Sequence, residues 1–119
     1  MIGIDVVSTK EVESMCFKRW FVLYAYTYEE FLKSETFSRS RKIEYLSSRF
    51  CAKEAVFKCL CSYTGEKLKF KPKSIEVLNN ANNVPVVKLD FPYDISFTGG
   101  LTVSISHKKN ICVAIALIK

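Results

Sequence analysis

Five short segments of the chain have the alternating or continuous apolar character of β-strands. They cover residues 1–7, 74–78, 84–89, 101–107 and 111–118. The last two are separated only by Lys108-Lys109-Asn110, so the chain is expected to close with a hairpin. The asparagine-rich run Asn79–Asn83 lies between the middle pair and predicts a second hairpin.

Helical patterns fill the spaces between these strands. The helices are expected over residues 9–18, 28–32 and Ser40–Cys61, with a loop over 62–73. Ser8 and Thr9 are candidate caps of the first helix, and Thr27 of the second, which has acidic residues in its first turn. Strands separated by helices predict one α+β domain over residues 1–119, with a mainly antiparallel sheet packed around a long central helix.

The long helix contains an unusual carboxylate. At about 100° per residue, its apolar stripe consists of Ile43, Leu46, Phe50 and Phe57. Glu54 falls inside that stripe, and a carboxylate on a core-facing side must be paired, hydrogen-bonded or bound to a metal. One interpretation is a structural ion pair with Lys53 or Lys58. The other is a functional carboxylate.

Asp5 is a second misplaced carboxylate, because aspartate is a poor strand residue and it interrupts the first predicted strand. It either caps the following helix or joins Glu54 when the strand packs on the long helix. Two neighbouring carboxylates repel each other unless a positive group lies between them. Mg²⁺ shared with ligand phosphates suits such a pair.

The segment Val103–Lys109 combines small hydroxyl groups with a histidine and two lysines at the end of a predicted strand. Hydroxyl, imidazole and ammonium groups are suitable phosphate ligands. The alternative is a solvated basic turn, since hairpin turns are usually polar.

Composition adds a charge preference and excludes some classes of site. The formal net charge of +6 favours acidic partners such as nucleic acid, anionic membranes, acidic proteins or polyphosphates, without choosing among them. No Cys-x-x-Cys pair occurs and His107 is the single histidine, so a zinc site is not expected. The five cysteines are expected to be reduced thiols of a cytosolic protein. The longest apolar runs are far short of a membrane span of about 18 residues.

Together these features resemble the 4′-phosphopantetheinyl transferase superfamily, in its short holo-acyl-carrier-protein synthase branch. Gly3-Ile4-Asp5 is similar to the family's Gly-x-Asp motif, and residues 49–58 are similar to its Arg-Phe-x-x-Lys-Glu-Ala-x-x-Lys helix. Val103–His107 matches its Val-Ser-Ile-Ser-His strand. Residues 74–79 and Pro85 resemble the hairpin between these two motifs.

The resemblance implies the 4′-phosphopantetheinyl transferase fold and an activity. The enzyme would transfer 4′-phosphopantetheine from coenzyme A to a serine of apo-acyl carrier protein and release 3′,5′-ADP. Mg²⁺ would be held by Asp5 and Glu54, and Glu54 and Lys58 would be catalytic. Coenzyme A would be bound by Arg49, Lys58, Pro85, His107 and Lys108. A homotrimer, a cytoplasmic location and a role in fatty acid biosynthesis are also implied, without nucleic acid or membrane partners.

Two other functions fit parts of the pattern. A basic nucleic-acid-binding module fits the net charge, but the basic residues are scattered and form no recognised motif. A relative that binds coenzyme A without transferring anything fits the same motifs. The presence of Asp5, Glu54 and Lys58 argues against that second alternative.

Overall fold

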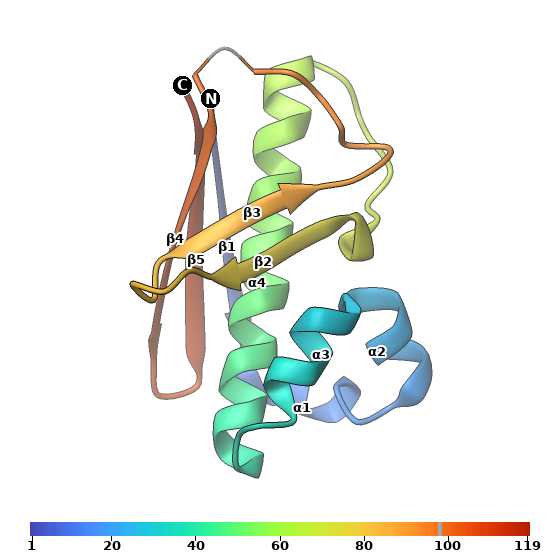
Figure 1. Cartoon of the computed structure of the whole chain (residues 1–119), viewed down its shortest axis with the longest axis vertical. Helices are drawn as coiled ribbons and strands as arrows, with labels where there is room; N and C mark the ends of the chain where they lie inside the picture. Colours follow the sequence, from blue (N-terminus) through green and yellow to red (C-terminus); the bar gives the residue numbers. More distant parts are fainter. Residues whose placement is uncertain (98) are drawn as a thin grey trace.

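A computed structural model describes residues 1–97 and 99–119 as an α+β fold built around one long helix (Figure 1). The strands are β1 (Ile2–Ser8), β2 (Ile75–Asn79), β3 (Pro85–Leu89), β4 (Leu101–Lys108) and β5 (Ile111–Ile118). The helices are α1 (Thr9–Met15), α2 (Arg19–Ala25), α3 (Tyr28–Ser34) and α4 (Arg39–Thr64), with a short 3-10 helix, η1 (Pro72–Ser74). The predicted fold class is therefore confirmed.

The strands form two antiparallel sheets, one of three strands in the order β1-β5-β4 and one of two strands, β2-β3. Both predicted hairpins are present, with Asn79 opposite Pro85 in one and Lys108 opposite Ile111 in the other. In Figure 1 the three-stranded sheet stands along one side of α4, and the β2–β3 hairpin crosses the helix. Helices α1 to α3 gather near the N-terminal end of α4.

The central helix is longer than its sequence pattern predicts, because it begins at Arg39 and continues to Thr64. Near its end the Thr64 hydroxyl donates to the Leu60 carbonyl at 3.0 Å. Gly65 then adopts a left-handed conformation with φ of 72°, which is the usual way for glycine to end a helix. The core lies where α4 meets the sheet, and buried residues such as Ala55, Val56 and Ala114 fill it.

The N-terminal helices differ most from the prediction. The first helix was expected to reach Lys18 but ends at Met15, and α2 was not predicted at all. The N-cap of α2 is Lys18, whose side chain makes no capping hydrogen bond, so the sequence carries no start signal there. The capping of α3 is as expected, because Thr27 and Glu30 form a reciprocal capping box.

The apolar face of β1 points away from α4. Ile2, Ile4 and Val6 are more than half exposed, whereas Gly3, Asp5 and Val7 face the helix. The outer face of β5 continues the same surface with Ile111, Ile115 and Leu117, each more than a third exposed. Within the described residues, no helix is both long and apolar enough to cross a lipid bilayer.

Candidate active site

Gly3 sets the position of Asp5 by allowing β1 to lie directly against α4. A Cβ atom at Gly3 would stand 2.1 Å from the carbonyl oxygen of Ala55 and 2.6 Å from the amide nitrogen of Cys59. Only glycine permits such a close backbone approach. Because side chains two residues apart share a face of a strand, Asp5 also faces the helix, beside the turn that carries Glu54 and Lys58.

Asp5 is incompletely paired. Its Oδ1 accepts a hydrogen bond from Lys58 Nζ at 2.8 Å, and the same ammonium group donates to the Ile4 carbonyl at 3.2 Å. Asp5 Oδ2 is buried and has no hydrogen-bond partner among the described residues. The Asp5 side chain is 10% exposed, whereas that of Lys58 is 54% exposed, so the lysine head remains open to solvent.

Glu54 completes this cluster and has an unusual proton affinity. Burial, followed by the neighbouring Asp5 carboxylate, raises the pKa of Glu54 to about 7, although Lys58 acts in the opposite direction. The contact with Asp5 raises the pKa of Lys58, since the carboxylate favours the charged ammonium. The ammonium group of Lys58 is bonded to Asp5 alone, so two carboxyl groups lie beside one cation and the cluster has a deficit of positive charge.

Neither of the structural ion pairs considered for Glu54 forms. Lys58 pairs with Asp5, and Lys53 is fully buried against Glu30, with 2.7 Å between Nζ and Oε1. Glu54 lies beside Asp5, as one interpretation expected, and its functional role stays a prediction. Asp5 does not cap the following helix, because Ser8 is the N-cap of α1.

The donor set of this cluster fits a hard divalent cation. No group of three or more His, Cys, Asp or Glu side chains with metal-site geometry occurs in residues 1–97 and 99–119, so a closed protein cage is absent there. Mg²⁺ is commonly held by only one or two carboxylates, with substrate phosphates and water as the other ligands. The unpartnered Oδ2 of Asp5 and the raised pKa of Glu54 are what such a site would show without its cation.

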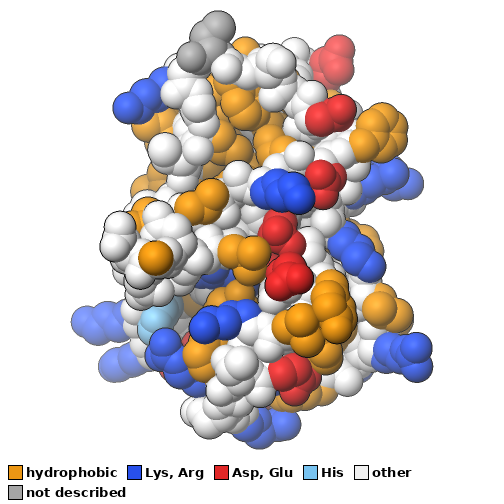
Figure 2. All heavy atoms as spheres, in the orientation of Figure 1, with side chains coloured by type: hydrophobic (Ala, Val, Ile, Leu, Met, Phe, Trp, Pro, Cys, Tyr) orange, Lys and Arg blue, Asp and Glu red, His pale blue; other side chains and the backbone are white. Residues whose placement is uncertain are grey.

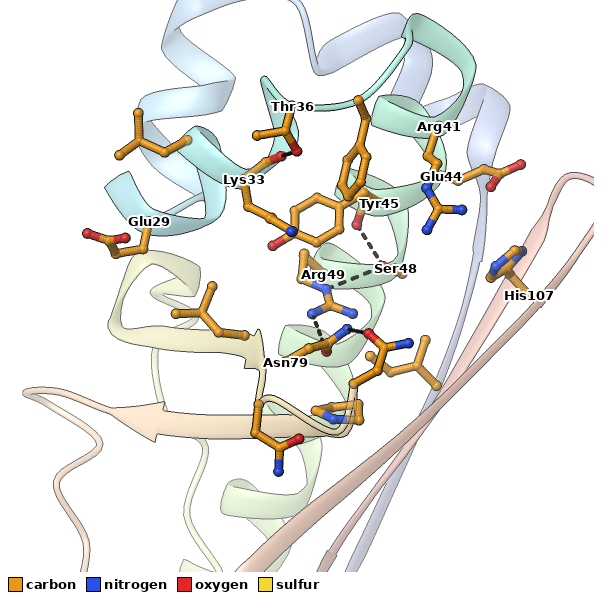
Figure 3. A pocket seen from close by; sticks show the side chains of 17 residues that line it. Glu29, Lys33, Thr36, Arg41, Glu44, Tyr45, Ser48, Arg49, Asn79 and His107 are labelled. Atoms are coloured by element: carbon orange, nitrogen blue, oxygen red, sulfur yellow. Dashed lines mark hydrogen bonds between the residues drawn. The ribbon is translucent and has the colours of Figure 1, made fainter.

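A cavity of about 760 Å³ lies on another side of α4, between α3, the β2–β3 hairpin and β4 (Figure 3). Arg49, Pro85 and His107, which the sequence predicted as ligand-binding residues, all line it. Lys108 is not among the described residues that line it. Basic side chains also gather near the histidine on the surface (Figure 2).

Arg49 is held firmly in the wall of this cavity. Its Nη1 donates to the Val77 carbonyl at 3.2 Å and to Asn79 Oδ1 at 3.1 Å, and its guanidinium lies over the Tyr45 ring. Burial lowers the pKa of Arg49, yet guanidinium groups remain charged at neutral pH. The wall therefore offers a fixed positive charge.

Sequence reasoning missed several residues of this cavity, including Lys33, Arg41 and Tyr45. Arg41 and Tyr45 precede Arg49 by two turns and one turn of α4, so a stripe at i, i+4, i+8 was the available signal. Lys33 comes from α3, whose position against α4 cannot be derived from spacing. The cavity thus combines cations with aromatic rings, the amides of Asn79, Asn80 and Asn83, and the carboxylates of Glu29 and Glu44.

The two groups of functional candidates lie on different faces of α4. Arg49 and Glu54 are five positions apart, which corresponds to about 140° around the helix axis. In the three-stranded sheet, Asp5 belongs to β1 and His107 to β4, at opposite edges, with β5 between them. Asp5, Glu54 and Lys58 do not line the cavity that contains Arg49 and His107. The candidate residues therefore form two separate groups on one chain.

Comparison with known proteins gives consistent results. The sequence profile of the 4′-phosphopantetheinyl transferase superfamily matches residues 1–116. The chain is 32% identical to the holo-[acyl-carrier-protein] synthase of Thermodesulfovibrio yellowstonii over 98% of this chain and 96% of that protein. It is 35% identical to that of Streptococcus suis, over 98% and 92%. A crystal structure of a holo-(acyl-carrier-protein) synthase from Bacillus anthracis, in complex with CoA (3′,5′-ADP), is similar with a TM-score of 0.79 and 28% identity, covering 98% of this chain and 93% of the other.

Proposed function

This chain belongs to the 4′-phosphopantetheinyl transferase superfamily, in its holo-[acyl-carrier-protein] synthase branch, and we propose that it transfers 4′-phosphopantetheine from coenzyme A to a serine of apo-acyl carrier protein. The observation that carries the proposal is the cluster of Asp5, Glu54 and Lys58, where two neighbouring carboxyl groups have one ammonium group, which is bonded to Asp5. Such a cluster suits the handling of a pyrophosphate. The second product is 3′,5′-ADP.

Asp5 and Glu54 are proposed to hold Mg²⁺. When bound, this ion would supply positive charge to the pyrophosphate oxygens of coenzyme A. The residues fit it because Asp5 Oδ2 has no other partner among the described residues and carboxylate oxygens are the ligands that Mg²⁺ prefers.

The reaction itself needs positioning and charge stabilisation. The serine oxygen of the carrier attacks the β-phosphorus, the bond from that phosphorus to the 3′,5′-ADP oxygen breaks, and the serine proton must be accepted. Glu54 is the proposed acceptor, because its carboxyl group lies in the cluster where the pyrophosphate would bind and carboxylates serve as general bases. Lys58 can turn its exposed ammonium group from Asp5 to the phosphate and stabilise the charge of the leaving group.

The nucleotide end of coenzyme A is proposed to occupy the cavity of about 760 Å³. Arg49 and His107 would bind its 3′-phosphate, and Pro85 and Tyr45 would contact the base. The crystallised relative from Bacillus anthracis is in complex with CoA (3′,5′-ADP), which supports coenzyme A as the ligand. Arg41, close to the Phe37 ring, adds a further cation to the cavity.

A homotrimer is also proposed, because the family resemblance implies one. The metal half-site and the nucleotide half-site lie on different faces of α4, so a complete site requires two copies of the chain. The outer face of β1 and β5 supplies the contact, because monomers rarely leave a contiguous apolar sheet face in water. Residues 1–119 are proposed to act as one domain of this assembly, since α4 contacts strands of both sheets. A cytoplasmic location and a role in fatty acid biosynthesis stay predictions.

The experiment that tests the proposal follows the small product. Incubation of the chain with coenzyme A, Mg²⁺ and an apo-acyl carrier protein is expected to release 3′,5′-ADP, detected by chromatography. A carrier whose acceptor serine is replaced by alanine is the matched control and should give none. Equal release with both carriers would mean that coenzyme A is hydrolysed rather than used as a donor.

A further inference from the structure

A buried ion pair lies outside the residues assigned so far. Glu30 of α3 and Lys53 of α4 have fully buried side chains, with 2.7 Å between Oε1 and Nζ. Burying two charges costs more than packing two apolar side chains of similar size. The pair therefore calls for an explanation other than general stability.

Every polar atom of the pair has a partner. The Lys53 ammonium donates to Glu30 and also to the carbonyls of Pro72 and Ile75, at 2.9 and 2.6 Å. Glu30 Oε1 accepts from the Thr27 amide at 2.9 Å, and Oε2 accepts from the Val77 amide at 2.8 Å. This complete set of partners fixes the orientation of both side chains.

The partners on β2 lie along one edge of that strand. The second sheet has only two strands, so β3 pairs with one edge of β2 and the other edge is left for side chains. Lys53 binds the Ile75 carbonyl, Glu30 binds the Val77 amide, and Arg49 binds the Val77 carbonyl. Three charged side chains thus take the place of a neighbouring strand.

This arrangement links the buried pair to the nucleotide cavity. Val77 receives Glu30 on its amide and Arg49 on its carbonyl, so the same peptide segment that Glu30 fixes also orients the guanidinium. Asn79, two residues further along β2, binds Arg49 as well and stands opposite Pro85 in the hairpin. A shift of β2 would move Arg49 and the hairpin wall together.

We propose that Glu30 and Lys53 are positioning residues, which hold the inner edge of β2 so that Arg49 and the β2–β3 hairpin meet the 3′-phosphate end of coenzyme A. The inference rests on the proposed function, because it assigns the cavity to that nucleotide. Loss of the Glu30–Lys53 pair should therefore weaken the binding of coenzyme A. The contact of Arg49 with the 3′-phosphate is remote from the reacting phosphorus, so it is made equally in the ground state and in the transition state.

The test measures the Kd for 3′,5′-ADP by calorimetry, and kcat and KM for coenzyme A, in Glu30→Gln, Lys53→Met and the double variant. The double variant removes both charges, so it keeps the test valid if a single variant with one unpaired buried charge fails to fold. Glu35→Gln is the matched control, because Glu35 also links α3 to α4, through an ion pair with Lys42 at 2.9 Å, without contacting β2.

The Kd for 3′,5′-ADP and the KM for coenzyme A are expected to rise about tenfold or more in the folded variants, which corresponds to the loss of a charge-assisted hydrogen bond. The kcat should stay within about threefold, and Glu35→Gln should bind 3′,5′-ADP normally. Folded variants with an unchanged Kd, or a defect confined to kcat, would overturn the inference and leave the proposed function intact. If the unaltered chain does not bind 3′,5′-ADP, the assignment of the cavity fails and the inference fails with it.

Discussion

Lys58 Nζ lies 2.8 Å from Asp5 Oδ1, and it is the only ammonium group paired with this carboxylate in the described residues. The other oxygen, Asp5 Oδ2, is buried without a partner. Burial and the nearby Asp5 carboxylate raise the pKa of Glu54. Because two carboxyl groups lie beside one ammonium group, binding of a further cation to this cluster is favoured.

Without Mg²⁺, the stability contribution of Glu54 should fall as the pH rises from about 4.5 to about 7. Between these values the folded chain keeps the proton and the unfolded chain has lost it, so each step up in pH favours unfolding. Below about pH 4.5 Glu54 is protonated in both the folded and the unfolded chain, so its full contribution to stability is present. Thermal unfolding should therefore show Glu54→Gln more stable than the unaltered chain at pH 8, by roughly 2–6 °C in Tm.

Mg²⁺ should reverse the difference in Tm between the unaltered chain and Glu54→Gln. At pH 8, millimolar Mg²⁺ should raise the Tm of the unaltered chain, because a cation that binds only the folded state stabilises it. The Tm of Glu54→Gln and of Asp5→Asn should respond much less. Equal shifts in all three proteins would mean that Mg²⁺ binds elsewhere, and this readout needs no substrate.

His107 and Lys58 should affect different kinetic constants. His107 lines the nucleotide cavity, remote from the Asp5 cluster, so His107→Ala should mainly raise KM for coenzyme A, with a smaller effect for 3′-dephospho-coenzyme A. Lys58→Ala should mainly lower kcat, by about 10²-fold or more, with either substrate. Steady-state kinetics of both variants with both substrates provides the measurement. The assigned role of His107 is wrong if its replacement costs the same factor with and without the 3′-phosphate.

Gly3 should not tolerate a methyl group. The new Cβ would meet the Ala55 carbonyl at 2.1 Å, so β1 must move away from α4 and take Asp5 with it. We expect Gly3→Ala to lower the free energy of unfolding by about 1–3 kcal/mol and to reduce kcat in the fraction that remains folded. Gly65→Ala is the control, since it introduces backbone strain at φ of 72° but has open space around its Cβ. Urea unfolding and transfer rates should separate the two variants, and a normal kcat in folded Gly3→Ala would contradict this account.

Much of this arrangement can be predicted from the sequence, because it depends on local signals. Both hairpins carry their own turn residues, and the misplaced carboxylates Asp5 and Glu54 stand out against apolar surroundings. Helix α2 lacked a side-chain cap and was missed for that reason. The partner of Lys53 was also unpredictable, since Glu30 lies 23 positions away and meets it only through the packing of α3 on α4.

The division into two half-sites is a tertiary property as well. Spacing on the helix shows that Arg49 and Glu54 point in different directions, but only the strand order β1-β5-β4 reveals that Asp5 and His107 lie at opposite edges. A list of motif residues therefore suggests one continuous site, whereas the folded chain separates them.

Subunit complementation tests the shared site. At coenzyme A concentrations far below the raised KM of Arg49→Ala, Lys58→Ala and Arg49→Ala should each be nearly inactive, while a mixture refolded together should regain activity. Random mixing would leave about one site in four with both intact halves. Ile4→Glu, on the outer face of β1, should yield monomers by sedimentation and abolish transfer. Mixtures no more active than their components would contradict a site built from two copies.

The most direct test of the central claim is the mass of a carrier protein after incubation with this chain, coenzyme A and Mg²⁺. The account predicts a gain of one phosphopantetheine on the acceptor serine, lost with Asp5→Asn and with excess chelator. An established holo-acyl-carrier-protein synthase, run on the same carrier, shows that the serine is accessible. If that enzyme modifies the carrier and the mass stays unchanged with this chain, the chain is not a phosphopantetheinyl transferase for this carrier and the proposed role of the Asp5–Glu54–Lys58 cluster is contradicted.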